Sequence, residues 1–183
     1  MKHSVHFLLM ARYNQRMNQQ VYAAAGRLTP QELVQERGAF FGSILGTLNH
    51  LLVGDLIWLR RFAAHSERYE ALNALGVLPI PNGLDDRLYH HLDDLEPVRY
   101  TVDMVILSWL DHEVEEDDFS RSLEYRNVQG VSFERDFGEL LSHLFNHQTH
   151  HRGQVSTLLS QCGQDVGITD FLMEIPELGQ DDL

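Results

Sequence analysis

The sequence predicts an all-α protein, a four-helix bundle with one long crossover connection and a possible small hairpin before the last helix. Apolar residues recur three and four positions apart over four long stretches, which is the spacing of an amphipathic helix. A segment rich in proline and glycine separates the second stretch from the third, as a crossover connection would. Only one short region has the composition of strands.

Two of the long helices are expected in the first half of the chain. The first covers Val5–Gly26, with a glycine at its end, and the second covers Gly38–Ala63. Between them, Thr29 is predicted to cap a short helix that starts at Pro30. Glu32, three residues after the threonine, completes the pattern of a capping box, and proline suits the first helical position.

The third long helix follows a connection over residues 65–98. The connection contains residues that interrupt regular structure, namely Gly76, Pro79, Pro81, Gly83 and Pro97. Within it, Asp85–Leu95 is predicted to form one short helix. The third long helix itself is expected at Arg99–Phe119, where the apolar residues again have helical spacing.

A hairpin and the fourth long helix complete the predicted fold. Two strand-like segments flank Gln129 and Gly130, a pair that suits a turn. The fourth long helix covers Phe137–Gln161, and Gly163 is a natural residue to follow the end of a helix. Because the chain has no repeat and no low-complexity segment, we expect a single domain over residues 1–183.

Charge and composition exclude several partners. The chain has 14 basic and 27 acidic residues, a net charge of −13 at pH 7. Nucleic acid and anionic lipid are bound by neutralising phosphates with lysine and arginine, so we expect neither nucleic acid nor a membrane as a partner. No apolar run approaches the ~20 residues of a membrane span. The single cysteine, Cys162, allows no disulfide within the chain, and we expect a cytoplasmic protein.

Histidines are concentrated in the fourth predicted helix. The chain has 11 histidines, of which four lie between His143 and His151. Residues four apart on a helix point the same way, which pairs His143 with His147 and His147 with His151. Two imidazoles placed in this way can reach one metal ion at about 2.0–2.1 Å. The spacing therefore predicts a metal site on this helix, with His150 turned away from it.

A pair of histidines on one helix needs a third ligand from elsewhere, and His50 is the best candidate. It lies in the middle of the second predicted helix, in a strongly apolar segment. A histidine in such a place is often a hydrogen-bonded core residue, and that interpretation stays open. The cores of helical bundles are, however, where such proteins build metal sites.

Glycines recur every four residues on the same predicted helix. Gly38, Gly42, Gly46 and Gly54 are in register with His50. Each mid-helix glycine costs about 1 kcal/mol relative to alanine, so a row of them indicates that another helix approaches closely. The row indicates either tight helix packing alone or, in addition, room for a metal and its ligand beside His50.

Other chemistries fit the residues less well. A zinc protease would have Glu where this chain has Gln148, and no G-x-S-x-G motif is present for a serine hydrolase. The acidic run Glu113–Asp118 lacks the order of a calcium loop and is interpreted as a solvated helix end. Cys162 is interpreted as packing, and the His90–Asp94 segment as an exposed polar turn rather than a loose metal site.

The sequence resembles the DinB/YfiT-like metalloproteins. One motif is His50-x-x-x-Gly54-Asp55-x-x-Trp58-Leu59-x-Arg61-Phe62, and the second runs from His143 to Gln154 and contains His-His-Arg-Gly-Gln. The resemblance implies an up-down-down-up bundle, a homodimer, and a divalent metal held by His50, His147 and His151. It leaves His143 and His150 in supporting or packing roles.

Characterised relatives in this family use low-molecular-weight thiols, as in bacillithiol S-transferases and in maleylpyruvate isomerase with mycothiol, and many other members have no assigned activity. From the open three-histidine site together with this resemblance, we expect a divalent-metal-dependent enzyme of the thiol S-transferase type with a small-molecule substrate, with zinc or nickel favoured and iron or manganese as further candidates. A non-catalytic stress or interaction protein with a structural metal, and a metal-dependent hydrolase, are the alternatives. The residues leave open the substrate, the thiol and the roles of His143, His150, Arg152 and Gln154.

Overall fold

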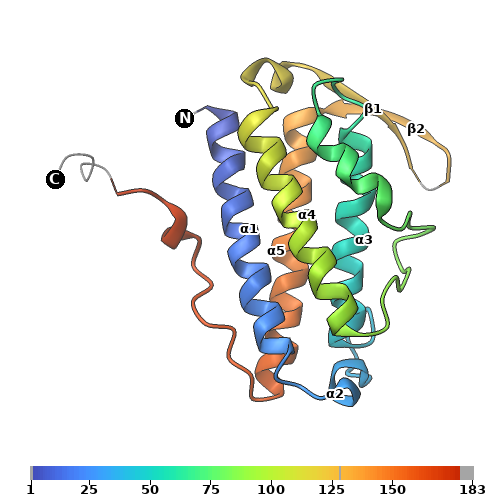
Figure 1. Cartoon of the computed structure of the whole chain (residues 1–183), viewed down its shortest axis with the longest axis vertical. Coiled ribbons are helices and arrows are strands. Elements are labelled where there is room, and N and C mark those ends of the chain that lie inside the picture. Colours follow the sequence, from blue (N-terminus) through green and yellow to red (C-terminus); the bar gives the residue numbers. More distant parts are fainter. Residues whose placement is uncertain (1, 128, 178–183) are drawn as a thin grey trace.

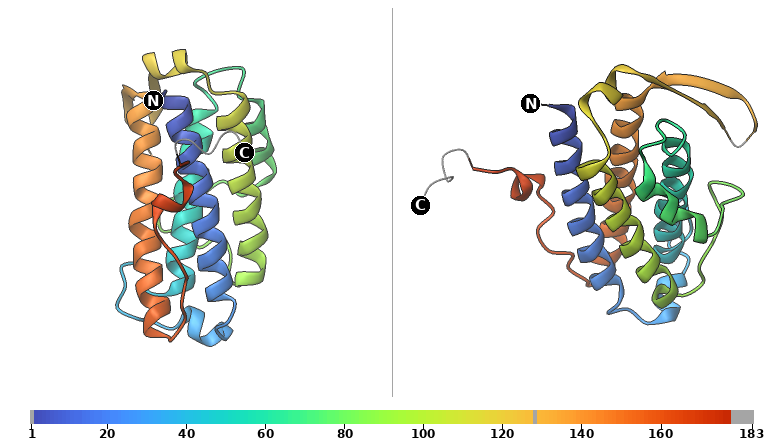
Figure 2. Two further views of the ribbon diagram at one scale, coloured as in Figure 1. Left: turned by 90° about the vertical axis from the view of Figure 1, so that its left-hand side faces the viewer. Right: turned by 45° about the horizontal axis from the view of Figure 1, so that its top comes forward.

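A computed structural model describes residues 2–127 and 129–177 of the chain (Figure 1). The described residues are mostly helical, and a small two-stranded antiparallel sheet is their other regular structure, as the sequence predicts. The four long helices are α1 (His3–Ala25), α3 (Ile44–Phe62), α4 (Leu92–His112) and α5 (Phe137–Gln161). They lie side by side, with α1 and α5 running in one direction and α3 and α4 in the other (Figures 1 and 2).

The core lies between these helices. α1 packs against α4 and α5, and α3 packs against α5 and, less extensively, against α4. At one end, three fully buried aromatic side chains meet, with Phe62 stacked on Trp109 at 5.5 Å and edge-on to Phe137 at 5.6 Å between ring centroids. Such aromatic pairs contribute beyond their buried area, so they tie three of the long helices together. None of the described helices is long and apolar enough to cross a membrane.

The capping box after α1 is confirmed. The short helix α2 covers Pro30–Val34, and the hydroxyl of Thr29 accepts a hydrogen bond from the backbone N–H of Glu32 at 3.3 Å. In return, the backbone N–H of Thr29 donates to the Glu32 carboxylate at 2.7 Å. These two bonds satisfy donors that the first turn of a helix leaves free.

The start of α3 differs from the prediction. The helix begins at Ile44 rather than Gly38, and Ser43 caps it by accepting a bond from the N–H of Gly46 at 3.0 Å. Gly38 and Gly42 have φ angles of 67° and 76°, which a right-handed helix does not contain. Of the predicted glycine row, only Gly46 and Gly54 are helical, because the first two glycines shape the turn before α3.

The bounds of α4 also differ. One helix over Leu92–His112 replaces the short helix predicted at Asp85–Leu95 and the long one predicted at Arg99–Phe119. Pro97 does not break the helix, because it lies in the second turn of α4, where the carbonyl left without a donor belongs to the exposed Asp93. The preceding connection contains instead a 3-10 helix, η1 (Glu70–Val77).

The hairpin and α5 agree with the prediction. Strands β1 (Ser122–Arg126) and β2 (Ser132–Asp136) pair so that Tyr125 lies opposite Phe133. β2 leads directly into α5, whose bounds match the predicted Phe137–Gln161. Asp136 caps α5 by accepting from the N–H of Glu139 at 2.8 Å.

The acidic run after α4 is only partly solvated, because Glu115 and Asp117 are exposed as predicted whereas Asp118 is not. Asp118, in the 3-10 helix η2 (Glu116–Ser120), is buried and forms ion pairs with Arg68 at 2.9 Å and with Arg121. Glu116 accepts hydrogen bonds from the backbone N–H groups of His3 at 2.9 Å and Ser4 at 3.2 Å. Glu116 therefore attaches the segment after α4 to the start of α1, and Asp118 attaches it to Arg68 in the connection after α3.

The residues after α5 lie along α1 and include the 3-10 helix η3 (Phe171–Glu174) (Figure 2). Arg16 of α1 donates to the carbonyls of Ile168 and Asp170, each at 2.9 Å, and pairs with Glu174 at 2.5 Å. The hydroxyl of Tyr13 donates to the carbonyl of Thr169 at 2.9 Å. This segment, for which the sequence predicts no regular structure, is therefore attached to the helical core.

Candidate metal centre

Three histidines from two helices converge on one point. The Nε2 atom of His50, on α3, lies 2.9 Å from the Nε2 of His147 and 3.2 Å from the Nε2 of His151, both on α5. Their ligand atoms all lie within 4.8 Å of one another, a group that could hold a metal ion. The structure thus brings together the three histidines selected from the sequence, and His50 is not an isolated core histidine.

Local sequence explains this convergence. His147 and His151 are four residues apart, so both imidazoles lie on the same side of α5. On α3, Gly54 follows His50 by one turn and faces α5, where a Cβ at position 54 would lie 2.8 Å from Cε1 of His147. The close approach predicted from the glycines is therefore present at Gly54, and it makes room for the imidazole of His147.

In His50 and His151, the Nδ1 atom faces away from the cluster, and its hydrogen bond fixes the tautomer of the ring. Nδ1 of His50 lies 2.8 Å from the backbone carbonyl oxygen of Leu84, and Nδ1 of His151 lies 2.8 Å from the amide oxygen of Gln154. Both oxygens only accept, so Nδ1 carries the proton in each ring. The Nε2 atoms of His50 and His151 therefore present lone pairs to each other.

This arrangement fits a cation. Two lone pairs 3.2 Å apart with no proton between them repel, and a positive charge at the centre of the cluster removes the conflict. Nitrogens bound tetrahedrally to zinc are separated by roughly 3.3 Å, and the distances from Nε2 of His50 to Nε2 of His147 and to Nε2 of His151 are within a few tenths of an ångström of this value. In the described part of the chain, Nδ1 of His147 is buried without a hydrogen-bond partner.

Burial keeps the three imidazoles in the form that binds metals. It lowers the pKa of His50 and His151, and together with the neighbouring histidines it lowers the pKa of His147 to about 3. The desolvated imidazolium is the disfavoured form, so all three rings are neutral near pH 7. Neutral imidazole is the species that coordinates a metal.

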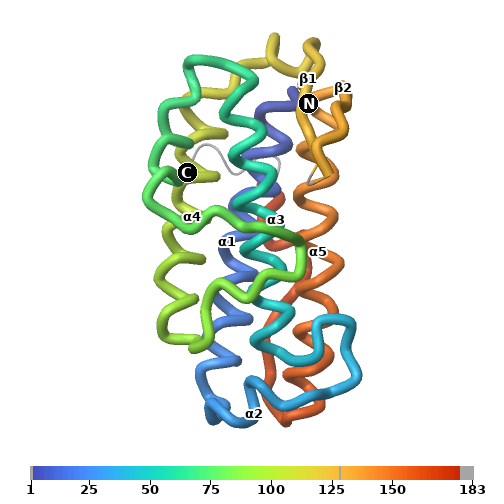
Figure 3. The backbone as a smooth tube through the Cα atoms, turned by 90° about the vertical axis from the view of Figure 1, so that its right-hand side faces the viewer, coloured from blue at the N-terminus to red at the C-terminus, as the bar shows by residue number. Residues whose placement is uncertain are grey.

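An aromatic side chain covers one side of the cluster. The ring of Phe41 stacks on His50 at 3.8 Å between centroids and meets His151 edge-on at 5.4 Å. Phe41 belongs to the turn before α3, and Figure 3 shows this segment and residues 78–90 on the same side of α3. Phe40, next to Phe41 in the chain, is 88% exposed, and Leu84, whose carbonyl faces His50, is 52% exposed, so residues adjacent to the site expose apolar surface.

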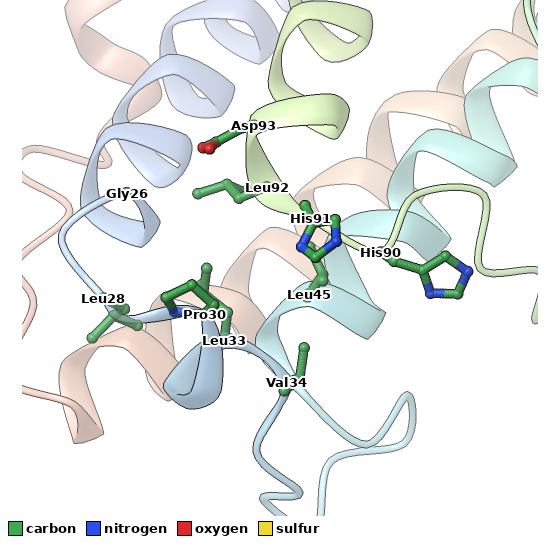
Figure 4. A pocket seen from close by; sticks show the side chains of 10 residues that line it. All are labelled: Gly26, Leu28, Pro30, Leu33, Val34, Leu45, His90, His91, Leu92 and Asp93. Atoms are coloured by element: carbon green, nitrogen blue, oxygen red, sulfur yellow. The ribbon is translucent and has the colours of Figure 1, made fainter.

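The remaining histidines of α5 lie outside the cluster. His143 contacts the ring of Trp58 at 5.2 Å, and His150 is exposed, with its Nε2 3.3 Å from the amide nitrogen of Gln154. His90 and His91 are exposed and line a separate pocket near Leu45 (Figure 4). Among the described residues, they belong to no group of three potential ligands.

Buried polar residues support the helices that hold the site. Arg99 of α4 pairs with Asp55 at 2.6 Å and with Asp103 at 2.8 Å, and all three side chains are buried. Arg152 of α5 hydrogen-bonds to the side-chain amides of Asn14 and Gln148 rather than to an acidic residue. The sequence motifs do not predict this network, although Asp55 in an apolar helix is a signal for it.

The fold and the cluster define a mostly helical protein with a candidate three-histidine metal centre. The chain belongs to the DinB family, whose model matches residues 1–180. It is similar to Protein DinB of Bacillus subtilis (strain 168), with 24% identity over 160 residues that cover 87% of each chain. No solved structure matches the chain.

Proposed function

We propose that this DinB family protein binds one divalent metal ion through Nε2 of His50, His147 and His151. The observation that carries the proposal is the 3.2 Å distance between Nε2 of His50 and Nε2 of His151, in rings whose Nδ1 atoms each face an accepting oxygen. We further propose that the four long helices form the up-down-down-up bundle that the sequence motifs imply. Zinc and nickel are the favoured metals because imidazole suits both, with iron or manganese as further candidates.

We propose an activity of the thiol S-transferase type. Three neutral histidines leave at least one position open on a divalent metal, as in catalytic rather than structural zinc sites. A metal held there acts as a Lewis acid that favours the deprotonated form of an incoming thiol or of water. In S-transfer, the thiolate sulfur bonds to an electrophilic carbon, the leaving group departs as an anion, and the thiol proton passes to solvent.

Apolar side chains near the site favour an organic substrate. Phe40 and Leu84 expose apolar surface beside the cluster, and Phe41 covers one face of His50. Large exposed apolar side chains beside a candidate site are typical of surfaces that bind a partner or ligand. A small electrophile with an apolar portion, together with a low-molecular-weight thiol, is therefore the substrate pair that we propose.

A protein whose metal is only structural is the second candidate. Among the described residues, the Nδ1 partners of His50 and His151 are a backbone carbonyl and an amide, and no carboxylate hydrogen-bonds to the three histidines. A general base for hydrolysis is thus not evident, which also makes a metal-dependent hydrolase the weaker alternative. We retain homodimer formation and a cytoplasmic location as proposals based on the motifs and the composition.

Metal analysis tests the proposal. Untagged protein purified without chelator or added metal should contain about one divalent metal per chain, and a His147→Ala variant should contain none. Consumption of monochlorobimane only with both thiol and metal would then support S-transfer, whereas turnover without thiol would favour hydrolysis. If the wild-type protein bound no metal after reconstitution with Zn²⁺ or Ni²⁺, the metal centre would be refuted.

A further inference from the structure

Among the described residues, His151 is the histidine of the cluster whose Nδ1 hydrogen-bonds to another side chain. His50 is fixed by the backbone carbonyl of Leu84, and Nδ1 of His147 has no partner among the described residues. Nδ1 of His151 faces the amide oxygen of Gln154. We propose that Gln154 is a positioning residue that holds His151 in the tautomer able to bind a metal, an inference that rests on the proposed function.

The geometry of Gln154 suits this role. It follows His151 by three residues on α5, and its amide oxygen accepts the Nδ1 proton at 2.8 Å. The other end of the amide, its nitrogen, lies 3.3 Å from Nε2 of His150. The amide nitrogen donates to Nε2 of His150 when His150 carries its proton on Nδ1, so the orientation in which the oxygen faces His151 is compatible with both contacts.

Loss of this bond would change what His151 presents to the cluster. A neutral imidazole carries its proton on either nitrogen, and the partner of one nitrogen decides the state of the other. Without an acceptor at Nδ1, the proton can move to Nε2 and form an N–H···N bond to His50, whose Nε2 is 3.2 Å away. Nε2 of His151 would then carry a proton and Nε2 of His50 would accept it, so neither nitrogen would have a lone pair free to bind a metal.

Zinc affinity gives the first test. A Gln154→Leu variant removes the acceptor, and we expect it to weaken Zn²⁺ binding about 10-fold to 100-fold, the usual effect of losing a hydrogen bond to a metal-bound histidine. Gln154→Glu retains an acceptor and should bind Zn²⁺ at least as tightly as the wild type. The matched control is Gln161→Leu, the same substitution at an exposed position of α5. Competition with a chromogenic chelator measures each affinity.

The imidazole tautomer gives a second test, which does not depend on metal. Nitrogen-15 NMR of the metal-free wild type should show His151 protonated at Nδ1, and the Gln154→Leu variant should show protonation at Nε2. If the wild type bound no Zn²⁺, the proposed metal function would fail, yet the NMR result would still decide the role of Gln154. An unchanged tautomer together with unchanged zinc affinity in Gln154→Leu would overturn the inference. If that variant lost its helical circular dichroism, Gln154→Ala would decide the same question.

Discussion

Gly54 of α3 faces the imidazole of His147 so closely that a Cβ at position 54 would lie 2.8 Å from Cε1 of that ring. The same ring also places its Nε2 2.9 Å from Nε2 of His50, one turn earlier on α3. The absence of a side chain at one position of α3 thus decides where a potential ligand from α5 can lie. The close packing of α3 against α5 therefore also sets the geometry of the candidate site.

Replacing this glycine should damage both stability and metal binding. Gly54→Ala forces His147 to shift, and overpacking of this kind costs about 1–3 kcal/mol of unfolding free energy. Gly153→Ala is the matched control, because a Cβ added at position 153 of α5 would have no atom within 4 Å apart from its chain neighbours and the backbone of its own helix. That control should be more stable than the wild type by up to about 1 kcal/mol, since alanine favours a helix. Urea unfolding and zinc titration of both variants measure the two effects.

Alanine variants at neighbouring turns of α5 can test which of its histidines bind the metal. His147→Ala should abolish metal binding, whereas His143→Ala, one turn earlier, should retain it, because His143 packs against Trp58 outside the cluster. Elemental analysis of the two purified variants measures this difference. Loss of metal in His143→Ala with a normal circular dichroism spectrum would mean that the ligand set is wrong.

Removing the buried guanidinium of Arg99 should lower the free energy of unfolding. Arg99→Met leaves Asp55 and Asp103 buried without the guanidinium that they share, and breaking such pairs costs about 3–5 kcal/mol. Arg12→Met changes an exposed arginine of α1 and should alter the unfolding free energy by less than about 0.5 kcal/mol. Chemical denaturation measures both. Equal losses in the two variants would contradict a special role for the buried network.

Glu116 should make the stability of the protein depend on acid pH. Hydrogen bonds from the backbone N–H groups of His3 and Ser4 lower the pKa of Glu116 from 4.5 to about 2. Because the folded pKa lies below the unfolded one, this stabilisation is complete above pH 4.5 and is lost as the pH falls toward 2. The wild type should therefore exceed Glu116→Gln in stability near neutral pH, and the difference should shrink over that range. Unfolding curves at a series of pH values measure it, and a difference that stayed constant would refute the assignment.

Local features of the chain are predictable from sequence. The bounds of α5, the capping box at Thr29 and the hairpin before α5 agree with the structure. Each depends on residues that lie within a few positions of one another, so short sequence patterns are enough to predict the contacts involved. The spacing of His147 and His151 belongs to the same class, because a single helix places both rings.

Features that depend on distant contacts are predicted less well. The turn at Gly38 and Gly42 is predicted as helix, because glycine spacing alone does not distinguish a helical row from positions with positive φ. Pro97 is predicted to lie before the third long helix, yet α4 begins before it. The acidic run is predicted to face solvent, although Asp118 is buried beside Arg68 and Arg121. Glycine conformation, helix bounds and burial thus depend on structure that short sequence patterns do not specify.

Local sequence is enough to specify the helical class of this protein, most of its long helices and the pair of histidines one turn apart on α5. That His50 joins this pair depends on tertiary structure, since α3 and α5 meet closely where Gly54 leaves space. Tertiary structure also selects which nitrogen of His50 faces the cluster, through the carbonyl of Leu84. Helical spacing is a local property of the backbone, whereas the convergence of ligands and the choice of tautomer arise from groups that only folding brings together.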